Sequence, residues 1–285
     1  MAVWFGQSNE AVAMATTDAG DPFRGSVPLV YERYLVPLIF QPYADEMGAR
    51  VIAAAPRRVL EIAAGTGVVT RVLASWLPPS TGIVATDLSE AMLQVAQTLG
   101  TSRPVTWQQA DAMQLPFPDG TFDAVVCQFG AMFFPDKPHA FAEARRVLAP
   151  GGRLFFNVWD RIEDNDFPRV VVKAVAKLCP DDPPTFLEQI PHGYHDVAAI
   201  RADVLAGGFD IASVETLALR SRANSPEAAA IAFCQGTPMR NEIEARRGIT
   251  LAEATDAATR AIASEFGNGA IDGRIQAHVA IAAKR

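Results

Sequence analysis

The chain has 285 residues, of which 49% are hydrophobic, enough to build the core of one large domain or two small ones. Its 25 basic and 32 acidic residues give a net charge of −7, and no long basic run is present, which argues against nucleic acid as a partner. Three widely spaced cysteines argue against a disulfide framework and favour a reducing, cytoplasmic compartment. The sequence shows no Cys-x-x-Cys pair, no signal peptide pattern and no bilayer-length apolar run, so neither a metal site nor membrane insertion is expected.

The N-terminal part is predicted to be a helical cover. About 25 residues without a predicted element precede residues 27–55, which carry helical apolar spacing. Pro37 and Pro42 interrupt this spacing, and proline inside a helix usually breaks it. We therefore expect two separate helices within 27–55.

From residue 57 onward, apolar runs alternate with helical patterns. Strands are predicted at 57–63, 82–87, 105–111, 122–130 and 153–159, and helices at 68–77, 89–100 and 138–152. Ser89 is a typical N-cap and Gly100 a typical helix-ending residue. Strands and helices in this order predict a parallel sheet with helices on both faces.

The remainder of the chain is predicted to complete the same domain. Residues 161–195 are polar and proline-rich, and we expect an irregular insertion that serves as a lid. A helix at 196–207, a strand at 210–220, helical structure at 225–267 and a final strand at 273–285 are predicted to follow. The expected organisation is one domain, 1–285, with the cover at 27–55, a ligand-binding core at 57–160, the lid at 161–195 and a C-terminal part at 196–285.

The stretch VLEIAAGTGVVT, residues 59–70, indicates a small-molecule site. Glycines after a buried strand let a ligand approach the backbone, and the next helix begins with free N–H groups. Glu61 ends the strand, where a buried carboxylate needs a polar partner. The pattern lacks the third glycine of a dinucleotide fingerprint, which counts against a nucleotide-linked oxidoreductase. An ordinary strand-to-helix turn is the alternative interpretation.

Acids at the next two strand ends suggest a nucleoside. Asp87 follows the glycine turn by about 20 residues, a spacing at which a carboxylate can accept hydrogen bonds from both ribose hydroxyls. Asp111 and the backbone of Ala112 could bind the adenine edge, and Leu88 and Met92 could supply apolar walls for the ring. The alternatives are a helix-capping Asp87 and a turn aspartate at 111.

Four segments in order carry a family resemblance: VLEIAAGTG, VATDLSEAML, ADAMQLPFPDGTFDAVVCQFGAMFF and EARRVLAPGGRLFFNVW. They resemble the S-adenosylmethionine-dependent methyltransferases of the seven-stranded, Rossmann-like class, in the branch of the ubiquinone/menaquinone biosynthesis methyltransferases. The resemblance covers residues 57–160. It implies an α/β, doubly wound, mostly parallel sheet with an antiparallel last strand, S-adenosyl-L-methionine as cofactor, and a small, apolar or aromatic methyl acceptor.

The resemblance also implies cofactor-binding residues. Around the methionine portion and the methyl group it places Glu61, Gly65, Thr66, Gly67, Gln128 and Phe129. Around the adenosine portion it places Asp87, Leu88, Met92, Asp111 and Ala112.

Methyl transfer from a sulfonium is an in-line displacement that depends mainly on alignment, although a hydroxyl or carbon acceptor also needs a base. The candidate bases are His139, His192, His195, Tyr31, Tyr34 and Tyr194.

The cluster IPHGYHD, residues 190–196, could belong to a lid over the acceptor or to an ordinary turn. Because no residue is an obvious base, a non-catalytic S-adenosylmethionine-binding module is also possible. The acceptor atom (O, N, C or S) and the oligomeric state, with a dimer possible, stay open.

Overall fold

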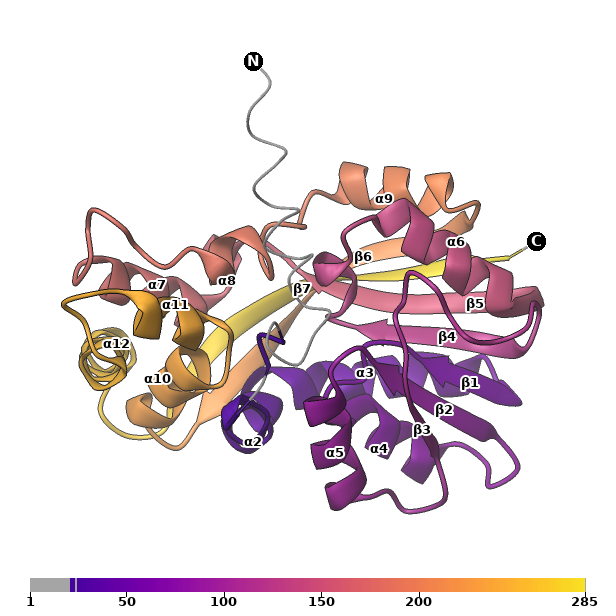
Figure 1. Ribbon diagram of the computed structural model, residues 1–285, viewed down its shortest axis with the longest axis horizontal. Helices are drawn as coiled ribbons and strands as arrows, with labels where there is room; N and C mark the ends of the chain where they lie inside the picture. The colour runs from indigo at the N-terminus through magenta and orange to yellow at the C-terminus, as the bar shows by residue number, and fades with distance from the viewer. Residues whose placement is uncertain (1–20, 24, 285) are drawn as a thin grey trace.

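A computed structural model of the protein describes residues 21–23 and 25–284. Within them, seven strands form one sheet in the order β3-β2-β1-β4-β5-β7-β6 (Figure 1). The strands are β1 (Arg58–Glu61), β2 (Gly82–Asp87), β3 (Thr106–Gln109), β4 (Phe122–Gln128), β5 (Leu148–Trp159), β6 (Asp210–Ala223) and β7 (Ile271–Ala283). β7 pairs antiparallel with both β5 and β6, and the other pairs are parallel. The predicted sheet with an antiparallel last strand is confirmed.

The helices surround this sheet. In chain order they are α2 (Val27–Val30), η2 (Tyr31–Phe40), α3 (Gln41–Ala53), α4 (Val68–Trp76), α5 (Glu90–Leu99), η3 (Ala131–Phe133), α6 (Lys137–Val147), η4 (Ile162–Asp164), α7 (Asp166–Ala176), α8 (Phe186–Gln189), α9 (Val197–Ala206), α10 (Pro226–Gln235), α11 (Met239–Ala245) and α12 (Leu251–Phe266). Because parallel crossovers are right-handed, α4 and α5 lie on one face and α6 on the other. α3 packs on α4, and α9 packs on α6.

The register brings the carboxyl ends of the central strands to one edge. Glu61 at the end of β1 lies opposite Val126 in β4, and Asp87 at the end of β2 lies opposite Gln109 in β3. β1 and β4 are covered on both faces, which is why their residues form nearly continuous apolar runs. The loops that leave this edge are therefore neighbours in space, as a ligand site of an open α/β sheet requires.

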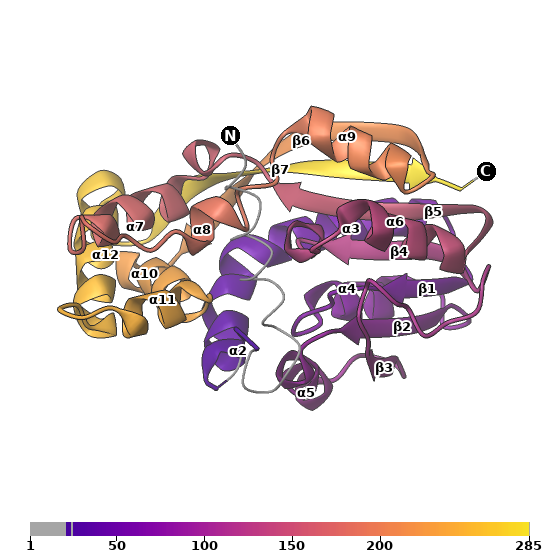
Figure 2. The same cartoon turned by 45° about the horizontal axis from the view of Figure 1, so that its top comes forward.

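A group of helices stands beyond that edge, which we call the helical cap (residues 166–192 and 226–266). α10, α11 and α12 are inserted between the long strands β6 and β7, and α7 and α8 follow β5. Contacts join α7 to α10 and α12, and α8 to α11. Figures 1 and 2 show these helices gathered at one end of the molecule.

The structure corrects the prediction that 161–195 is irregular, because this segment contains η4, α7 and α8. α7 buries Phe167, Val171 and Val175, which recur at helical spacing within an otherwise polar and proline-rich segment. The local composition concealed this apolar face. The segment is part of the cap rather than a loop over it.

The prediction of two helices broken by prolines is also wrong. α2, η2 and α3 follow one another without interruption from residue 27 to residue 53. η2 is a π-helical stretch that contains Pro37, and the N–H of Gln41 donates to the carbonyl of Val36, five residues earlier. In a π-helix the backbone hydrogen bonds run to the i−5 carbonyl. The i−4 carbonyl, with which a proline ring collides in an α-helix, is then not needed as the acceptor. Pro42 lies in the first turn of α3, where proline is tolerated.

Most of the predicted unstructured N-terminal segment, residues 1–20, lies outside the described residues. Asp21, Pro22 and Phe23 are described, and they line the cavity discussed below. A search of the described helices finds none with the length and apolar character needed to cross a bilayer.

Candidate functional site

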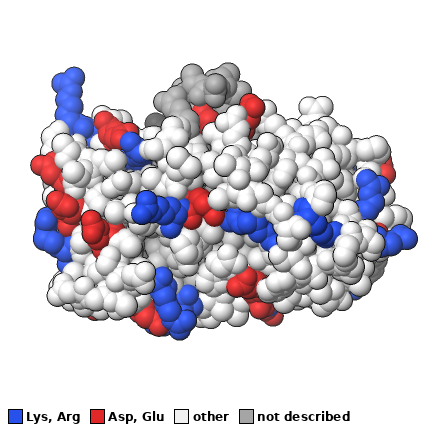
Figure 3. Space-filling model, turned by 90° about the horizontal axis from the view of Figure 1, so that it is seen from below, with Lys and Arg blue, Asp and Glu red and all other residues white. Residues whose placement is uncertain are grey.

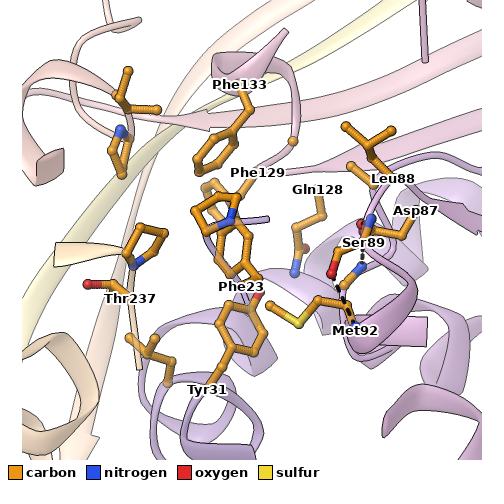
Figure 4. Close-up of a pocket in the computed structure, with 18 of the residues that line it drawn as sticks. Phe23, Tyr31, Asp87, Leu88, Ser89, Met92, Gln128, Phe129, Phe133 and Thr237 are labelled. Carbon is orange, nitrogen blue, oxygen red and sulfur yellow. Dashed lines mark hydrogen bonds between the residues drawn. The ribbon is translucent and has the colours of Figure 1, made fainter. Parts of the chain in front are cut away.

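A cavity of about 460 Å³ lies between the carboxyl edge of the sheet and the helical cap. The sheet half of its wall comes from the loops after β1 to β4 and from α5, and includes Ala63, Gly65, Asp87, Leu88, Met92, Asp111, Ala112, Gln128 and Phe129. The cap half includes Phe186, Leu187, Ile190, His192, Phe233 and Thr237. In Figure 4, the side chains of Asp87, Leu88, Ser89 and Met92 lie on one side of the cavity and Thr237 on the other, with Gln128, Phe129 and Phe133 between them.

The glycine turn presents only one of its glycines to the cavity. Gly65 has a φ of 57° and lines the wall, and a Cβ built on it would lie 3.6 Å from the Tyr31 hydroxyl. Gly67 has a φ of 82° and does not line the wall, and a Cβ on it would lie 2.7 Å from the Trp107 ring. Thr66 is buried behind the wall. Gly67 is therefore needed for close packing of the turn, and Gly65 is the glycine that a ligand can reach.

Asp87 connects the glycine turn to the loop before α5. Its Oδ2 accepts from the N–H of Gly65 at 2.7 Å, and its Oδ1 accepts from the N–H of Ser89 at 2.8 Å. Burial raises the pKa of Asp87 to about 6, although these bonds favour the charged form. The helix cap itself is Ser89, whose hydroxyl accepts from the N–H of Met92. Asp87 thus organises the loop while facing the cavity.

The other predicted nucleoside residues lie on the same part of the wall. Asp111 and Ala112 come directly after β3, and Leu88 and Met92 approach from the β2–α5 side. The Oδ1 of Asp111 accepts from the N–H of Met113 at 2.8 Å, which is a turn interaction.

Glu61 has a partner inside the protein. The side chain is 1% exposed and does not line the cavity, and its Oε2 accepts from the Thr70 hydroxyl at 2.5 Å. Burial raises the pKa of Glu61 to about 8, and the nearby charge of Asp87 adds to this effect. The buried carboxyl is thus accommodated by a hydroxyl from α4.

The floor of the cavity is built from two residues in the left-handed region. Ala63 and Phe129 have φ values of 54° and 53° and follow the ends of β1 and β4. Non-glycine residues rarely adopt such angles, and those that do are frequently found at functional sites. Gly130 lets the two loops meet, because a Cβ there would lie 2.4 Å from the Cβ of Ala63. The rings of Phe129 and Trp159 are stacked, with their centroids 3.7 Å apart, so this part of the cavity wall is flat and aromatic.

Gln128 lines the cavity beside this floor and holds a buried acceptor without a partner among the described residues. Its Nε2 donates to the carbonyl of Phe40 at 3.2 Å, which orients the amide. Its Oε1 is buried and has no hydrogen-bond partner among the described residues. Buried polar atoms are normally paired, so this oxygen is a position where a ligand donor would be favourable.

Of the three candidate tyrosines, the structure brings Tyr31 to the cavity wall. Burial and the charges of Asp87, Glu32 and Glu61 raise the pKa of Tyr31 far above its ordinary value of 10, so its hydroxyl stays protonated. Tyr34 and Tyr194 do not line the cavity.

Of the candidate histidines, His192 lines the cavity, and its Nδ1 lies 2.7 Å from the carbonyl of Asp160. His195 and His139 are off the wall. The Nδ1 of His195 lies 2.8 Å from the carbonyl of His192, and the Nε2 of His139 lies 2.9 Å from that of Met113. The 190–196 cluster thus delivers one histidine to the cavity and uses the other in a turn.

Sequence reasoning missed most of the cap half. Phe186, Phe233 and Thr237 come from helices and turns that carry no recognisable motif. Trp159 lies within a segment that carried the family resemblance, but nothing local showed that it would stack under the cavity.

Comparison with known proteins supports the same assignment of fold and family. Residues 60–156 match the family described as a methyltransferase domain. A demethylmenaquinone methyltransferase from Thermus thermophilus is 44% identical over 102 residues, which are 35% of this chain and 46% of the relative. The ubiquinone/menaquinone biosynthesis C-methyltransferase UbiE of Pseudomonas aeruginosa is 32% identical over 166 residues, 54% of this chain and 65% of the relative. Both alignments therefore span less than two thirds of the relative.

A solved structure shows the fold over a longer part of the chain. The [4+2]-cyclase SpnF superposes with a TM-score of 0.54 at 21% identity, covering 86% of this chain and 80% of the cyclase. At this identity the likeness concerns the fold. Together with the observed strand order, it shows that this chain has the seven-stranded, Rossmann-like fold, within which residues 60–156 match the methyltransferase domain.

Proposed function

We propose that the protein binds S-adenosyl-L-methionine in the sheet half of the cavity and transfers its methyl group to a small, apolar or aromatic molecule in the cap half. The observation that carries this proposal is the single cavity in which a glycine turn and two strand-end carboxylates face an apolar cap. The comparisons support the cofactor class through the methyltransferase domain at residues 60–156.

For the adenosine portion, Asp87 is the residue proposed to accept hydrogen bonds from the ribose hydroxyls. Asp111 and the N–H of Ala112 are proposed to bind the adenine edge, with Leu88 and Met92 against the ring. The support is their common position on the wall, beside the loop that Asp87 organises. An adenosine needs this combination of acceptors and apolar surface.

The methionine portion fits the residues around Gln128. Its unpaired Oε1 can accept from an ammonium group, and Gly65 leaves room for the backbone to approach. When bound, the cofactor supplies an electrophilic methyl group. Glu61, Thr66 and Gly67 lie behind the wall, and we propose that they support the turn rather than touch the cofactor.

The cap half favours an uncharged acceptor. Its surface is formed mainly by aromatic, aliphatic and proline side chains, and no Lys or Arg occurs among the described residues of the cavity wall. The acceptor would lie between this surface and the aromatic floor, and holding it in line with the methyl group can supply much of the rate. The names of the Thermus and Pseudomonas relatives refer to quinone biosynthesis, which agrees with an apolar acceptor.

The setting proposed for this activity is the cytoplasm, with no nucleic acid as substrate. Cys127, Cys179 and Cys234 are free thiols, as expected in a reducing compartment. Figure 3 shows basic and acidic side chains interspersed over one face of the molecule rather than a single basic track. A nucleic-acid-binding surface would need such a track.

The cofactor assignment is tested by ligand binding. S-adenosylhomocysteine should raise the thermal midpoint and NADH should not, because a ligand at 100 times its dissociation constant adds about 2.7 kcal/mol to the free energy of unfolding. Asp87→Ala should weaken S-adenosylhomocysteine binding by about 1.5–3 kcal/mol in a calorimetric titration. Asp119→Ala, at an exposed carboxylate off the wall, is the control.

Two results would contradict the assignment: no thermal shift at millimolar S-adenosylhomocysteine, or equal affinities of the Asp87 variant and the unchanged protein. Catalysis needs a separate measurement, the transfer of a radiolabelled methyl group to a panel of phenols, quinols and amines. Cofactor binding without transfer to any member would favour the non-catalytic alternative.

A further inference from the structure

We propose that His192 is the specificity-determining residue of the acceptor site, and that its Nε2 accepts a hydrogen bond from a hydroxyl or N–H group of the methyl acceptor. The acceptor class is then a neutral, largely apolar ring molecule that carries a hydrogen-bond donor. This inference rests on the proposed function, because it concerns the cap half of the same cavity.

The hydrogen bond of the other ring nitrogen determines what His192 can offer. The Nδ1 lies 2.7 Å from the main-chain carbonyl of Asp160, at the end of β5. A carbonyl oxygen only accepts, so Nδ1 must carry the hydrogen. In a neutral imidazole, Nε2 then holds a lone pair and can only accept.

The protein keeps the imidazole neutral and in place. His192 is 6% exposed, and this burial lowers its pKa to about 4. The nearby His195 also lowers the pKa, whereas the bond to Asp160 and the charge of Glu163 oppose the shift. The N–H of His192 donates to the carbonyl of Leu187 at 3.1 Å, which anchors the residue to α8. At neutral pH the ring therefore presents an uncharged acceptor.

The Asp160 segment that holds the ring is itself rigidly bonded. The carboxylate of Asp160 accepts from the Nε2 of Gln276 and from the N–H of Arg161, both at 2.7 Å. It also lies 3.2 Å from the Nε2 of His278 on β7. Gln276 and His278 belong to β7 of the sheet, so the direction of the His192 ring is set by the same framework that carries the cavity floor.

The other polar side chains in the cap half are already engaged with the main chain of the protein. Each of the following bonds at least one backbone N–H or carbonyl: Asn165, Thr237, Asn241 and Glu242. By contrast, no hydrogen bond joins the Nε2 of His192 to any of the described residues. A ligand donor is the natural partner, since an unpaired nitrogen in an apolar cavity is unfavourable.

The test compares two probes of similar shape on the full-length protein saturated with S-adenosylhomocysteine. 2-Naphthol can donate a hydrogen bond, whereas 2-methoxynaphthalene cannot. Titrations should show that the unchanged protein binds 2-naphthol more tightly by about 3- to 10-fold, the effect expected for one neutral hydrogen bond. His192→Phe should abolish this preference. The affinity of the variant for S-adenosylhomocysteine should stay within about twofold, because His192 is proposed to contact the acceptor and not the cofactor.

Two further variants sharpen the test. His192→Gln can place an amide oxygen near the position of Nε2 and should keep part of the preference. His139→Phe, at a histidine off the cavity wall, should keep all of it. Equal binding of the two probes, no saturable binding of 2-naphthol, or an unchanged preference in His192→Phe would overturn the inference. Failure to bind S-adenosylhomocysteine would instead overturn the proposed function, so the two failures are distinguishable.

Discussion

At the scale of single residues, two strand-end carboxyls of similar sequence context have different surroundings. Asp87 faces the cavity and accepts from two backbone N–H groups, whereas Glu61 faces α4 and accepts from Thr70. Burial raises the pKa of both, to about 6 for Asp87 and about 8 for Glu61. The two acids therefore make different contributions: one shapes a ligand loop and the other is a mostly neutral core group at pH 7.

Replacing Glu61 with Gln should make the stability of the protein less sensitive to pH between about 4.5 and 8. The folded pKa of about 8 lies above the ordinary value of 4.5, so the folded protein holds more protons between these values. Stability should fall as pH rises through this range, by up to about 1.4 kcal/mol per pH unit. A neutral Gln can still accept from Thr70 and removes this dependence. Urea unfolding of both proteins at pH 5, 7 and 8.5 should show an advantage of the variant that grows with pH. The same pH dependence in both proteins would show that Glu61 is ionised in the folded state.

At the scale of elements, the β1–α4 turn is held by packing as well as by hydrogen bonds. Gly67 begins α4 in the left-handed conformation and lies against Trp107 of β3 and Ala96 of α5. The turn therefore connects three elements, and its position determines where Gly65 meets the cavity. A side chain at position 67 would push this turn away from β3.

Gly67→Ala should destabilise the protein more than Gly151→Ala. Both glycines have positive φ, which costs alanine about 1–2 kcal/mol. At Gly151 nothing lies within 4 Å of an added Cβ, whereas at Gly67 it would meet the Trp107 ring, which adds about 1–3 kcal/mol of overpacking. Chemical denaturation of the two variants measures the difference. Trp107→Leu in the Gly67→Ala background should recover part of the loss, and equal costs at the two glycines would contradict the packing argument.

At the scale of the whole molecule, the cavity is closed by segments far apart in the chain. Glu242 of α11 accepts from the N–H groups of Thr185 and Phe186, which holds the start of α8 against α11 within the cap. Asn241 donates to the carbonyl of Pro22, and the ring of Phe23 packs edge-on against Phe133 of the sheet side. The described N-terminal residues thus bridge the cap and the sheet across the cavity.

Binding of S-adenosylhomocysteine should therefore slow hydrogen exchange in two separate segments. We expect protection within 27–55 and 161–195, concentrated at the parts that line the cavity, 31–40 and 186–192. The helix at 138–149 should change little, because α6 packs on β5 and α9 away from the cavity wall. α7 should respond less than α8, since its buried face already packs on α12. Equal protection everywhere, or none in these segments, would mean that they do not close over the ligand.

The sequence by itself determined the parallel core and the strand ends on which the site is built. Apolar runs, helix caps such as Ser89 and the glycine turn are local signals, because they reflect hydrogen bonding and burial within a few residues. They placed β1 to β4 within about two residues of their observed bounds and the end of β5 at Trp159, but β5 begins at Leu148, in a stretch predicted as the end of a helix. Since parallel strands bring their carboxyl ends to one edge, the order of strands and helices along the chain is enough to predict that Asp87 and Asp111 lie together.

The side that each of these residues faces depends on contacts between distant parts of the fold. Glu61 faces Thr70, and Gly67 faces Trp107, a residue forty positions later in the chain. The composition of 161–195 concealed α7, because its apolar face packs on elements that are distant in the sequence, α10, α12 and β7. His192 was one of several equivalent candidates until the carbonyl of Asp160 oriented its ring toward a cavity that no local pattern encodes. These outcomes depend on contacts between distant segments, whose energies are absent from any short stretch of sequence.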